Sequence, residues 1–187
     1  GVAMPISLNI SAYHLQQNNF IESIEKILDQ YPHVSHELIS FEILETAALS
    51  DIEKVSDVIT TCKRRGITFA VDDFGVGYSS LTYVKQLPAD LIKLDQSFVR
   101  NVLTSPDDIA ILKTIIELCQ YINKQVIAEG VETIAHGKLL LSLGCAQAQG
   151  YAIAKAMPAE EFVPWLKQWQ MKDRWSLTRY PADAYNS

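Results

Sequence analysis

Short β-rich runs alternate with helical patterns along this chain, the order typical of βα units that build a parallel sheet. The runs that predict strands are Ile6–Ile10, Ile39–Leu44, Thr68–Asp72, Leu91–Asp95, Gln125–Glu129 and Ala146–Tyr151. A capping-box pattern at Ser50 predicts a helix that ends before Gly66, and Ser105 followed by Pro106 predicts the start of another. Pro164 is expected to kink or interrupt the last helix.

Each predicted strand carries a polar group near its C-terminal end, on a face that otherwise holds small or mixed residues. In the second strand, Ser40 and Glu42 share one face, whereas Phe41 and Ile43 share the apolar face that suits a covering helix. An open doubly wound sheet needs apolar residues on both faces of its central strands, but a barrel can be polar inside where it forms an active site. The pattern therefore favours an α/β fold of the TIM type, a (β/α)8 barrel. About six strands are present, so two strands of the barrel are expected to be missing.

Length and charge limit the possible partners. The 187 residues predict one domain, with a barrel over residues 1–170 and a C-terminal tail over residues 171–187. The net charge of −6 argues against a nucleic acid polymer as partner, but not against a small phosphorylated ligand, because bound cations can supply positive charge. Three widely spaced cysteines suit free thiols, and no apolar run reaches the roughly 18 residues of a membrane span. We expect a cytoplasmic protein without direct membrane insertion.

The polar groups at the strand ends are mostly oxygen donors of the kind that Mg²⁺ or Mn²⁺ prefers. They are Asn9, Glu42, Glu45, Asp72, Asp73, Lys93, Glu129, Glu132 and Gln149. Asp72 and Asp73 lie where a strand turns into a loop, so one can point inward while the other reaches a second ion. Two ions roughly 3.5–4 Å apart activate a water in phosphoryl displacement. Lys93 could position that water or neutralise charge on a phosphate.

Structural explanations of the same residues stay open at this point. Lys93 could simply form an ion pair with Glu42 or Asp72 at the strand ends. Glu129 and Glu132 could be acids that interact favourably with the positive end of a helix dipole. Glu42 is harder to explain structurally, because an unpaired buried carboxylate is costly.

Six motifs occur in a family's order and spacing, over about residues 5–165. They are LNISA at 8–12, FEILET at 41–46, DDFGVGYSSL at 72–81, IKLD at 92–95, EGVET at 129–133 and QGY at 149–151. Together they resemble the motifs of the EAL family of cyclic di-GMP phosphodiesterases, which are TIM-type barrels. The resemblance implies hydrolysis of cyclic di-GMP to linear pGpG with two Mg²⁺ or Mn²⁺ ions.

The resemblance also implies a role for each matching position. Metal ligands would be Asn9, Glu42, Asp72, Asp73 and Glu129, with Glu129 a metal ligand or general base and Lys93 beside the attacking water. Glu132 and Gln149 would line the substrate site. Glu45, Gly75 and Gly77 would stabilise the loop that shapes the second metal site and lies near the family's dimer contact. A homodimer or other oligomer and an upstream sensory or GGDEF-type domain are the expected partners.

The Glu-Ala-Leu triplet that gives the family its name is absent from the sequence. The family places it on an N-terminal strand ahead of the LNISA strand, so the chain is expected to lack its first two strands and one metal ligand. The alternative to hydrolysis is therefore a non-catalytic receptor or interaction module for cyclic di-GMP. A third hypothesis is a barrel enzyme of another class, since this fold supports many chemistries.

Overall fold

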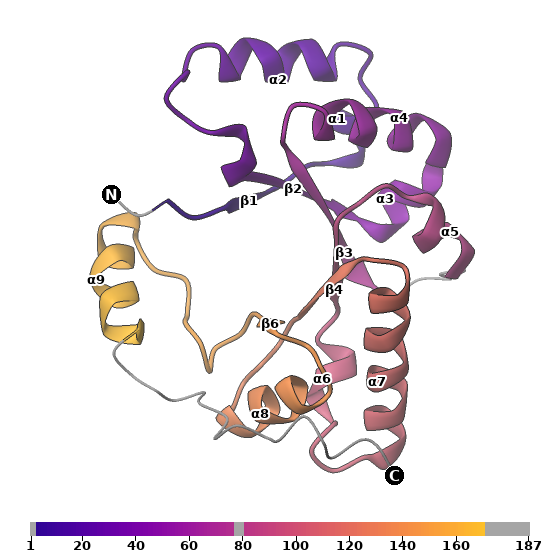
Figure 1. The fold of residues 1–187 in the computed structure, drawn as a ribbon, viewed down its shortest axis with the longest axis vertical. Coiled ribbons are helices and arrows are strands. Elements are labelled where there is room, and N and C mark those ends of the chain that lie inside the picture. The colour runs from indigo at the N-terminus through magenta and orange to yellow at the C-terminus, as the bar shows by residue number, and fades with distance from the viewer. Residues whose placement is uncertain (1–2, 77–80, 171–187) are drawn as a thin grey trace.

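A single curved sheet organises the chain. The structure is a computed structural model that describes residues 3–76 and 81–170. The sheet contains six parallel strands, and their order in space is their order in the sequence. They are β1 (Ile6–Asn9), β2 (Ile39–Leu44), β3 (Thr68–Phe74), β4 (Leu91–Leu94), β5 (Gln125–Ala128) and β6 (Gln147–Ala148). The sheet curves like part of a barrel wall (Figure 1), so the α/β half-barrel predicted from the strand pattern is confirmed.

Helices follow the strands and lie mainly on the outer side of the curved sheet (Figure 1). They are α1 (Ala12–Leu15), α2 (Phe20–Leu28), a 3₁₀ turn (His36–Leu38), α3 (Glu45–Ser50), α4 (Ile52–Lys63), α5 (Leu81–Gln86), α6 (Ser97–Arg100), α7 (Pro106–Tyr121), α8 (Ile134–Ser142) and α9 (Ala159–Gln170). Sequential parallel strands need such crossovers, because each connection must return the chain to the same end of the sheet. No helix among the described residues combines the length and the apolar character needed to cross a membrane.

The predicted strands differ from the structure mainly at their ends. β3 continues two residues past Asp72 to Phe74, and its pairing with β4 shifts register between Val71 and Phe74. β6 is shorter than predicted because its partner β5 ends at Ala128, which pairs with Ala148. Beyond that pair no residue of β5 is left to continue the ladder.

The structure confirms the predicted cap at Ser105, corrects the one predicted at Ser50, and shows no interruption at Pro164. Ser105 caps α7 ahead of Pro106 as predicted. The cap of α4, however, is Asp51, whose side chain accepts from the backbone N–H of Lys54, while Ser50 ends α3. Helix α9 is not interrupted at Pro164. The proline removes one backbone hydrogen bond on an exposed stretch, where water can satisfy the freed carbonyl.

The hydrophobic core lies between the outer face of the sheet and its helices. Phe41 and Phe69 on neighbouring strands meet edge to face at 5.5 Å between ring centroids, and Phe20 from α2 contacts Phe41 in the same way at 6.2 Å. All three rings are at least 97% buried. Full burial of such side chains contributes about 1.5–3 kcal/mol each. The apolar strand face predicted from the sequence is thus the face that holds the helices.

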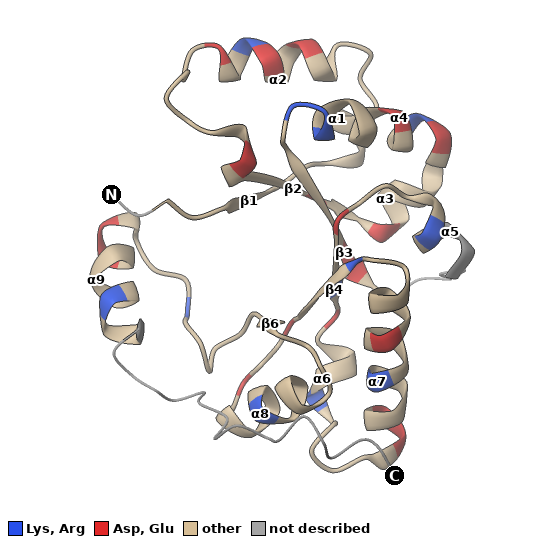
Figure 2. Ribbon diagram, viewed as in Figure 1, with Lys and Arg blue, Asp and Glu red and all other residues tan. Residues whose placement is uncertain are grey.

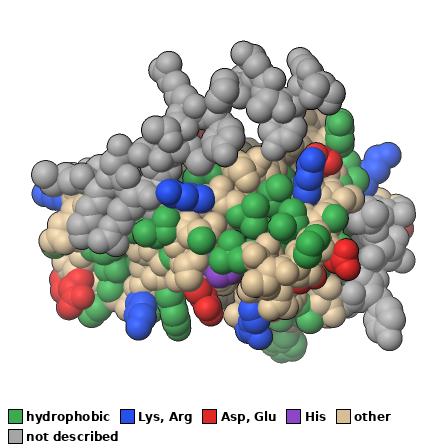
Figure 3. Space-filling model, turned by 90° about the horizontal axis from the view of Figure 1, so that it is seen from below, with side chains coloured by type: hydrophobic (Ala, Val, Ile, Leu, Met, Phe, Trp, Pro, Cys, Tyr) green, Lys and Arg blue, Asp and Glu red, His purple; other side chains and the backbone are tan. Residues whose placement is uncertain are grey.

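The side of the molecule seen from below presents a mixed surface (Figure 3). Hydrophobic side chains gather in the middle of that view, with lysines, arginines and acids around them. Three free cysteines, Cys62, Cys119 and Cys145, are buried in the core. Burial raises the pKa of Cys62 and Cys119 to about 11.

Candidate active site

Lys93 is the centre of a cluster of charges at the C-terminal ends of the strands. Its ammonium Nζ donates to Glu42 Oε2 at 2.7 Å, Asp72 Oδ1 at 2.7 Å and Glu129 Oε1 at 2.8 Å. These groups come from β2, β3 and β4 and from the residue after β5, four consecutive neighbours in the sheet. Because parallel strands all end at the same edge, the fold brings residues 51 positions apart into direct contact. Figure 2 shows acidic positions on these central strands.

Asp73 joins the cluster through an unusual backbone conformation. Its φ of 53° lies in the left-handed region, which Asp tolerates better than most residues. The conformation coincides with the register shift between β3 and β4, a bulge that redirects successive side chains. As a result, Asp72, Asp73 and Glu129 each offer an oxygen, and these oxygens lie within 4.8 Å of one another. Such a group of carboxylates offers the oxygen ligands that a hard divalent cation prefers.

The surroundings of the cluster shift the pKa values of several of its members. Burial alone would lower the pKa of Lys93, but its hydrogen bonds to Asp72, Glu129 and Glu42 outweigh burial and raise it. Lys93 is therefore an ammonium at neutral pH and a hydrogen-bond donor. Burial raises the pKa of Glu129 against the opposing hydrogen bond from Lys93, and the charges of Asp72 and Asp73 add to the rise. Burial, followed by repulsion from Asp72, also raises the pKa of Asp73.

Glu45 holds the loop that follows Asp73. Its carboxylate Oε2 accepts from the backbone N–H of Gly75 at 2.9 Å, and Glu45 is 5% exposed. Gly75 has a φ of 97°, and a Cβ atom there would lie 2.4 Å from Cε2 of Phe98. The position thus needs glycine for conformation and for space. Gly77, also predicted to stabilise this loop, lies outside the described residues.

Residues 96–98, the segment after β4, contact both turns that carry acids, a feature that the sequence did not reveal. Phe98 packs against Gly75, and Gln96 packs against Gly130, where an added Cβ would lie 2.5 Å from the Gln96 Cβ. Gly130 follows Glu129 directly and has a φ of 71°. Gln96 and Phe98 therefore support the turns on either side of Lys93. The sequence indicated these turns by a glycine shortly after each acid, but it did not indicate which residue packs against each glycine.

Three predicted site residues stay at the edge of the cluster. Asn9 pairs in register with Glu42 across β1 and β2, so it lies next to the cluster, but it is exposed. Glu132 and Gln149 are exposed too. None of the three side chains makes a hydrogen bond or ion pair within residues 3–76 and 81–170. The backbone of Gln149 is nonetheless fixed, since its N–H donates to Ala128 O and its carbonyl accepts from Val131.

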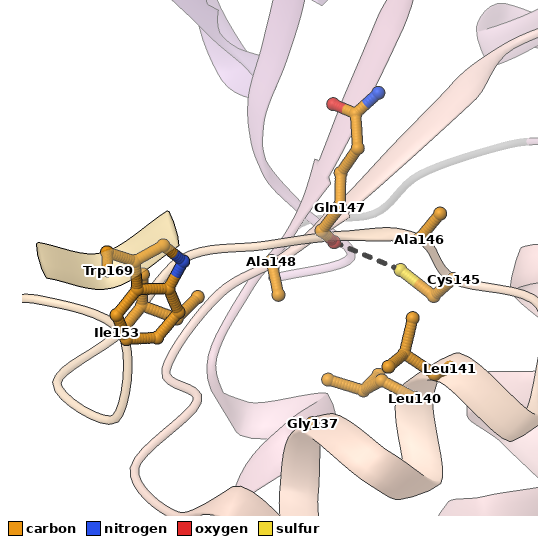
Figure 4. A pocket seen from close by; sticks show the side chains of 9 residues that line it. All are labelled: Gly137, Leu140, Leu141, Cys145, Ala146, Gln147, Ala148, Ile153 and Trp169. Atoms are coloured by element: carbon orange, nitrogen blue, oxygen red, sulfur yellow. Dashed lines mark hydrogen bonds between the residues drawn. The ribbon is translucent and has the colours of Figure 1, made fainter. Parts of the chain in front are cut away.

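An apolar pocket of about 430 Å³ lies apart from these acids, between α8, the β6 segment and Trp169 of α9 (Figure 4). Leu140, Leu141 and Ile153 line it, and Cys145 closes one side with its Sγ donating to Gln147 O at 3.2 Å. Its lining contains no charged residue, so it lacks the chemistry that a phosphate or a divalent cation needs.

The family model described as "EAL domain" matches residues 1–156. The chain belongs to the EAL family. A cyclic di-GMP phosphodiesterase of Pseudomonas aeruginosa is 34% identical to it over 167 residues, which are 89% of this chain and 28% of that protein. The bifunctional diguanylate cyclase/cyclic di-GMP phosphodiesterase MucR of the same species is 34% identical over 158 residues, 84% of this chain and 23% of MucR. This EAL domain thus spans about a quarter of the length of these curated relatives.

Solved structures carry the same fold. The structure titled "PaMucR Phosphodiesterase, c-di-GMP complex" is 33% identical with a TM-score of 0.78, and the match covers 84% of this chain and 64% of that one. A manganese/cy-diGMP complex of Klebsiella pneumoniae BlrP1 is 25% identical with a TM-score of 0.74, covering 82% of this chain and 39% of that one. The family resemblance read from the six motifs is therefore confirmed.

Proposed function

We propose that this EAL domain hydrolyses cyclic di-GMP to linear pGpG with two divalent cations, Mg²⁺ or Mn²⁺, as cofactors. The observation that carries the proposal is the Lys93 cluster, in which one ammonium binds three carboxylates and Asp73 lies within reach of two of them. The names of the relatives support the substrate, because MucR and BlrP1 were both solved with cyclic di-GMP.

The residues present fit a divalent cation. Asp72, Asp73 and Glu129 offer carboxylate oxygens, and Glu42 and the Asn9 amide oxygen stand next to them on the same edge of the sheet. All five are hard oxygen donors, which suits Mg²⁺ or Mn²⁺ and not a thiophilic metal. When bound, such ions would polarise the phosphodiester and activate a water for in-line displacement.

The protein's own groups then have distinct tasks. Lys93 is positively charged at neutral pH and lies among the acids, so we assign it a place beside the attacking water; it would donate to that water or to a phosphate oxygen when a carboxylate that it now binds turns to a cation. Glu129 has a raised pKa, which suits a carboxylate that ligates metal or accepts a proton from the water. Glu132 and Gln149 are exposed at the rim and free to contact the nucleotide.

The loop contacts position these groups without taking part in the chemistry. The bond from Glu45 to Gly75 fixes the turn after Asp73, and charge-assisted bonds of this kind are about twice as strong as neutral ones. A 1 Å displacement of a ligand can cost a factor of roughly 100 in rate. We therefore assign Glu45 a positioning role.

The second candidate function is cyclic di-GMP binding without turnover. The Glu-Ala-Leu triplet does not occur among these 187 residues, so the test has to separate binding from turnover. We also propose a homodimer or other oligomer, because the resemblance implies that the loop held by Glu45 lies near a dimer contact. The name of MucR supports a diguanylate cyclase-type domain in the parent protein.

The test is incubation of the purified chain with cyclic di-GMP and Mn²⁺ or Mg²⁺, with pGpG followed by chromatography. Product that EDTA and Asp72→Asn both abolish, and that the exposed control Asp57→Asn leaves unchanged, supports hydrolysis. Binding in calorimetry without product supports the receptor function. A chain that neither binds nor cleaves cyclic di-GMP contradicts both proposals.

A further inference from the structure

A second charged site lies at the other end of the sheet from Lys93. A cavity of about 620 Å³ is lined by Lys63, Lys85, Asp90, Tyr121, Asn123 and Lys124, and is called the lysine cavity below. Asp90 and Lys124 directly precede β4 and β5, whereas Lys93 and Glu129 lie at the C-terminal ends of the same strands. With a rise of about 3.3 Å per residue, the two sites are separated by roughly 10 Å or more of strand.

The charges of the lysine cavity do not balance. Asp90 is the one acid among its lining residues, and both of its oxygens are already engaged. Oδ1 accepts from Lys63 Nζ at 2.5 Å, and Oδ2 accepts from the backbone N–H of Phe69 at 3.2 Å. Three lysines against one carboxylate leave a formal charge of +2 in a chain whose net charge is −6. This local excess runs against the acidic character of the whole chain.

Lys124 is the member of the cavity that most lacks a counterion. It is 8% exposed, and its ammonium donates to two neutral acceptors, Leu87 O and Ala89 O, both at 2.7 Å. Burial, and then the charge of Lys63, lowers the pKa of Lys124, and the opposing charge of Asp90 does not restore it. A buried ammonium without an anionic partner is costly, and a bound anion removes that cost.

Lys85 completes the cationic lining at the exposed rim. It makes no hydrogen bond or ion pair with any residue that the structure describes, so its ammonium is available to a ligand. Tyr121, 86% exposed, and Asn123 add an aromatic ring and an amide at the same rim. The cavity is larger than one phosphate ion and falls within the size range of small-ligand sites.

We propose that the lysine cavity binds the phosphate group of a small phosphorylated molecule, with Lys124 and Lys63 at its base and Lys85 at its rim. Lysine ammonium groups are compact point charges that serve as phosphate binders. Asp90 neutralises Lys63, and the two remaining ammonium groups, those of Lys85 and Lys124, match the charge of a phosphate monoester dianion. The site does not depend on the proposed phosphodiesterase function, because it shares no residue with the Lys93 cluster.

Titrations of the isotope-labelled chain followed by NMR test the proposal. Inorganic phosphate, inorganic pyrophosphate and a nucleoside monophosphate are added in EDTA at constant ionic strength, with chloride as the reference anion. Saturable shifts of the amides of residues 85, 90 and 123–125, without equal shifts at residues 129–132, are expected. Tighter binding of the nucleotide than of inorganic phosphate identifies an organic phosphate as the ligand class, and equal binding identifies the free ion.

Variants distinguish a built site from general attraction to lysines. Lys85→Met is exposed and expected to fold normally, and it should weaken binding about tenfold, which equals about 1.4 kcal/mol. Lys63→Met removes a basal lysine and should have at least the same effect. Lys138→Met, an exposed lysine on α8 outside the cavity, should bind like the parent chain. The proposal is overturned if no phosphate compound saturates above the chloride reference, or if Lys85→Met and Lys63→Met bind as tightly as Lys138→Met.

Discussion

Replacing Lys93 by methionine should destabilise the fold strongly in the absence of metal. Methionine keeps most of the length of the side chain but removes the ammonium that binds Glu42, Asp72 and Glu129. The side chains of these acids are only 10%, 14% and 17% exposed, and that of Lys93 is 5% exposed. The substitution therefore leaves three carboxylates close together in a site with little access to water.

The expected magnitude follows from this burial. Removing one partner of a buried ion pair costs about 3–5 kcal/mol, since it leaves uncompensated charge. For a chain of this size each kcal/mol lowers Tm by roughly 2–4 °C, so the expected loss is roughly 6–20 °C. The wild-type contribution has a defined pH window. Because the folded-state pKa of Lys93 is raised, its stabilisation is complete below the ordinary lysine value of about 10.4 and is lost as the pH rises past it.

Thermal unfolding followed by circular dichroism at pH 7.5 in EDTA measures the effect. Lys138→Met is the matched control, an exposed lysine for which a change below about 0.5 kcal/mol is expected. The deficit of Lys93→Met should shrink as the pH is lowered, because the pKa of Glu129 is raised by burial and protonation of this carboxylate reduces the repulsion. If Lys93→Met unfolds within 2 °C of the control at pH 7.5, the cluster is not held together by this ammonium.

Two further predictions concern a turn and the core. Gly130→Ala should lower the free energy of unfolding by about 2–4 kcal/mol, because a positive φ and a 2.5 Å approach to Gln96 act together. Gly144→Ala should lower it by about 1–2 kcal/mol, because Gly144 has a φ of 86° but only the end of a flexible side chain nearby. Urea unfolding measures both. Cys62 and Cys119 should not react with a thiol reagent at pH 8 until denaturant is added, since burial raises their pKa to about 11. Fast labelling of the folded chain would contradict the packing of the core.

Most of the fold followed from side-chain alternation within short runs. The pairs Phe41/Ile43 and Ser40/Glu42 separate by parity, and the structure places the first pair under the helices and Glu42 on the inner edge with Lys93. Strand ends were less predictable, because they depend on where a partner strand stops. The predicted cap at Ser50 was wrong for a similar reason. Either of two adjacent residues could cap α4, and Ser50 is the last residue of α3, so Asp51 is the cap.

The site was predictable as a set of residue types but not as a geometry. The acids that bind Lys93 are set by the order of the strands in the sheet. From the sequence alone, an ion pair of Lys93 with Glu42 or Asp72 was as good an interpretation as a catalytic role. The structure makes both pairs at once and adds Glu129. The left-handed φ of Asp73 was not readable either, since Asp tolerates that region without requiring it. The metal ligation and the substrate contacts assigned to these residues stay predictions.

The parallel sheet explains how one small chain can carry two sites of opposite charge. Every strand runs in the same direction, so residues before the strands and residues after them collect at opposite ends. Asp73 lies at the end of β3, directly before its last residue Phe74, and Glu129 follows β5, whereas Asp90 and Lys124 directly precede β4 and β5. If both ends of the sheet carried charge of the same sign, the two groups of charges would repel each other across the sheet. With acids at one end and an excess of lysines at the other, the proposed cations and the proposed phosphate would bind to separate sets of residues and would not compete.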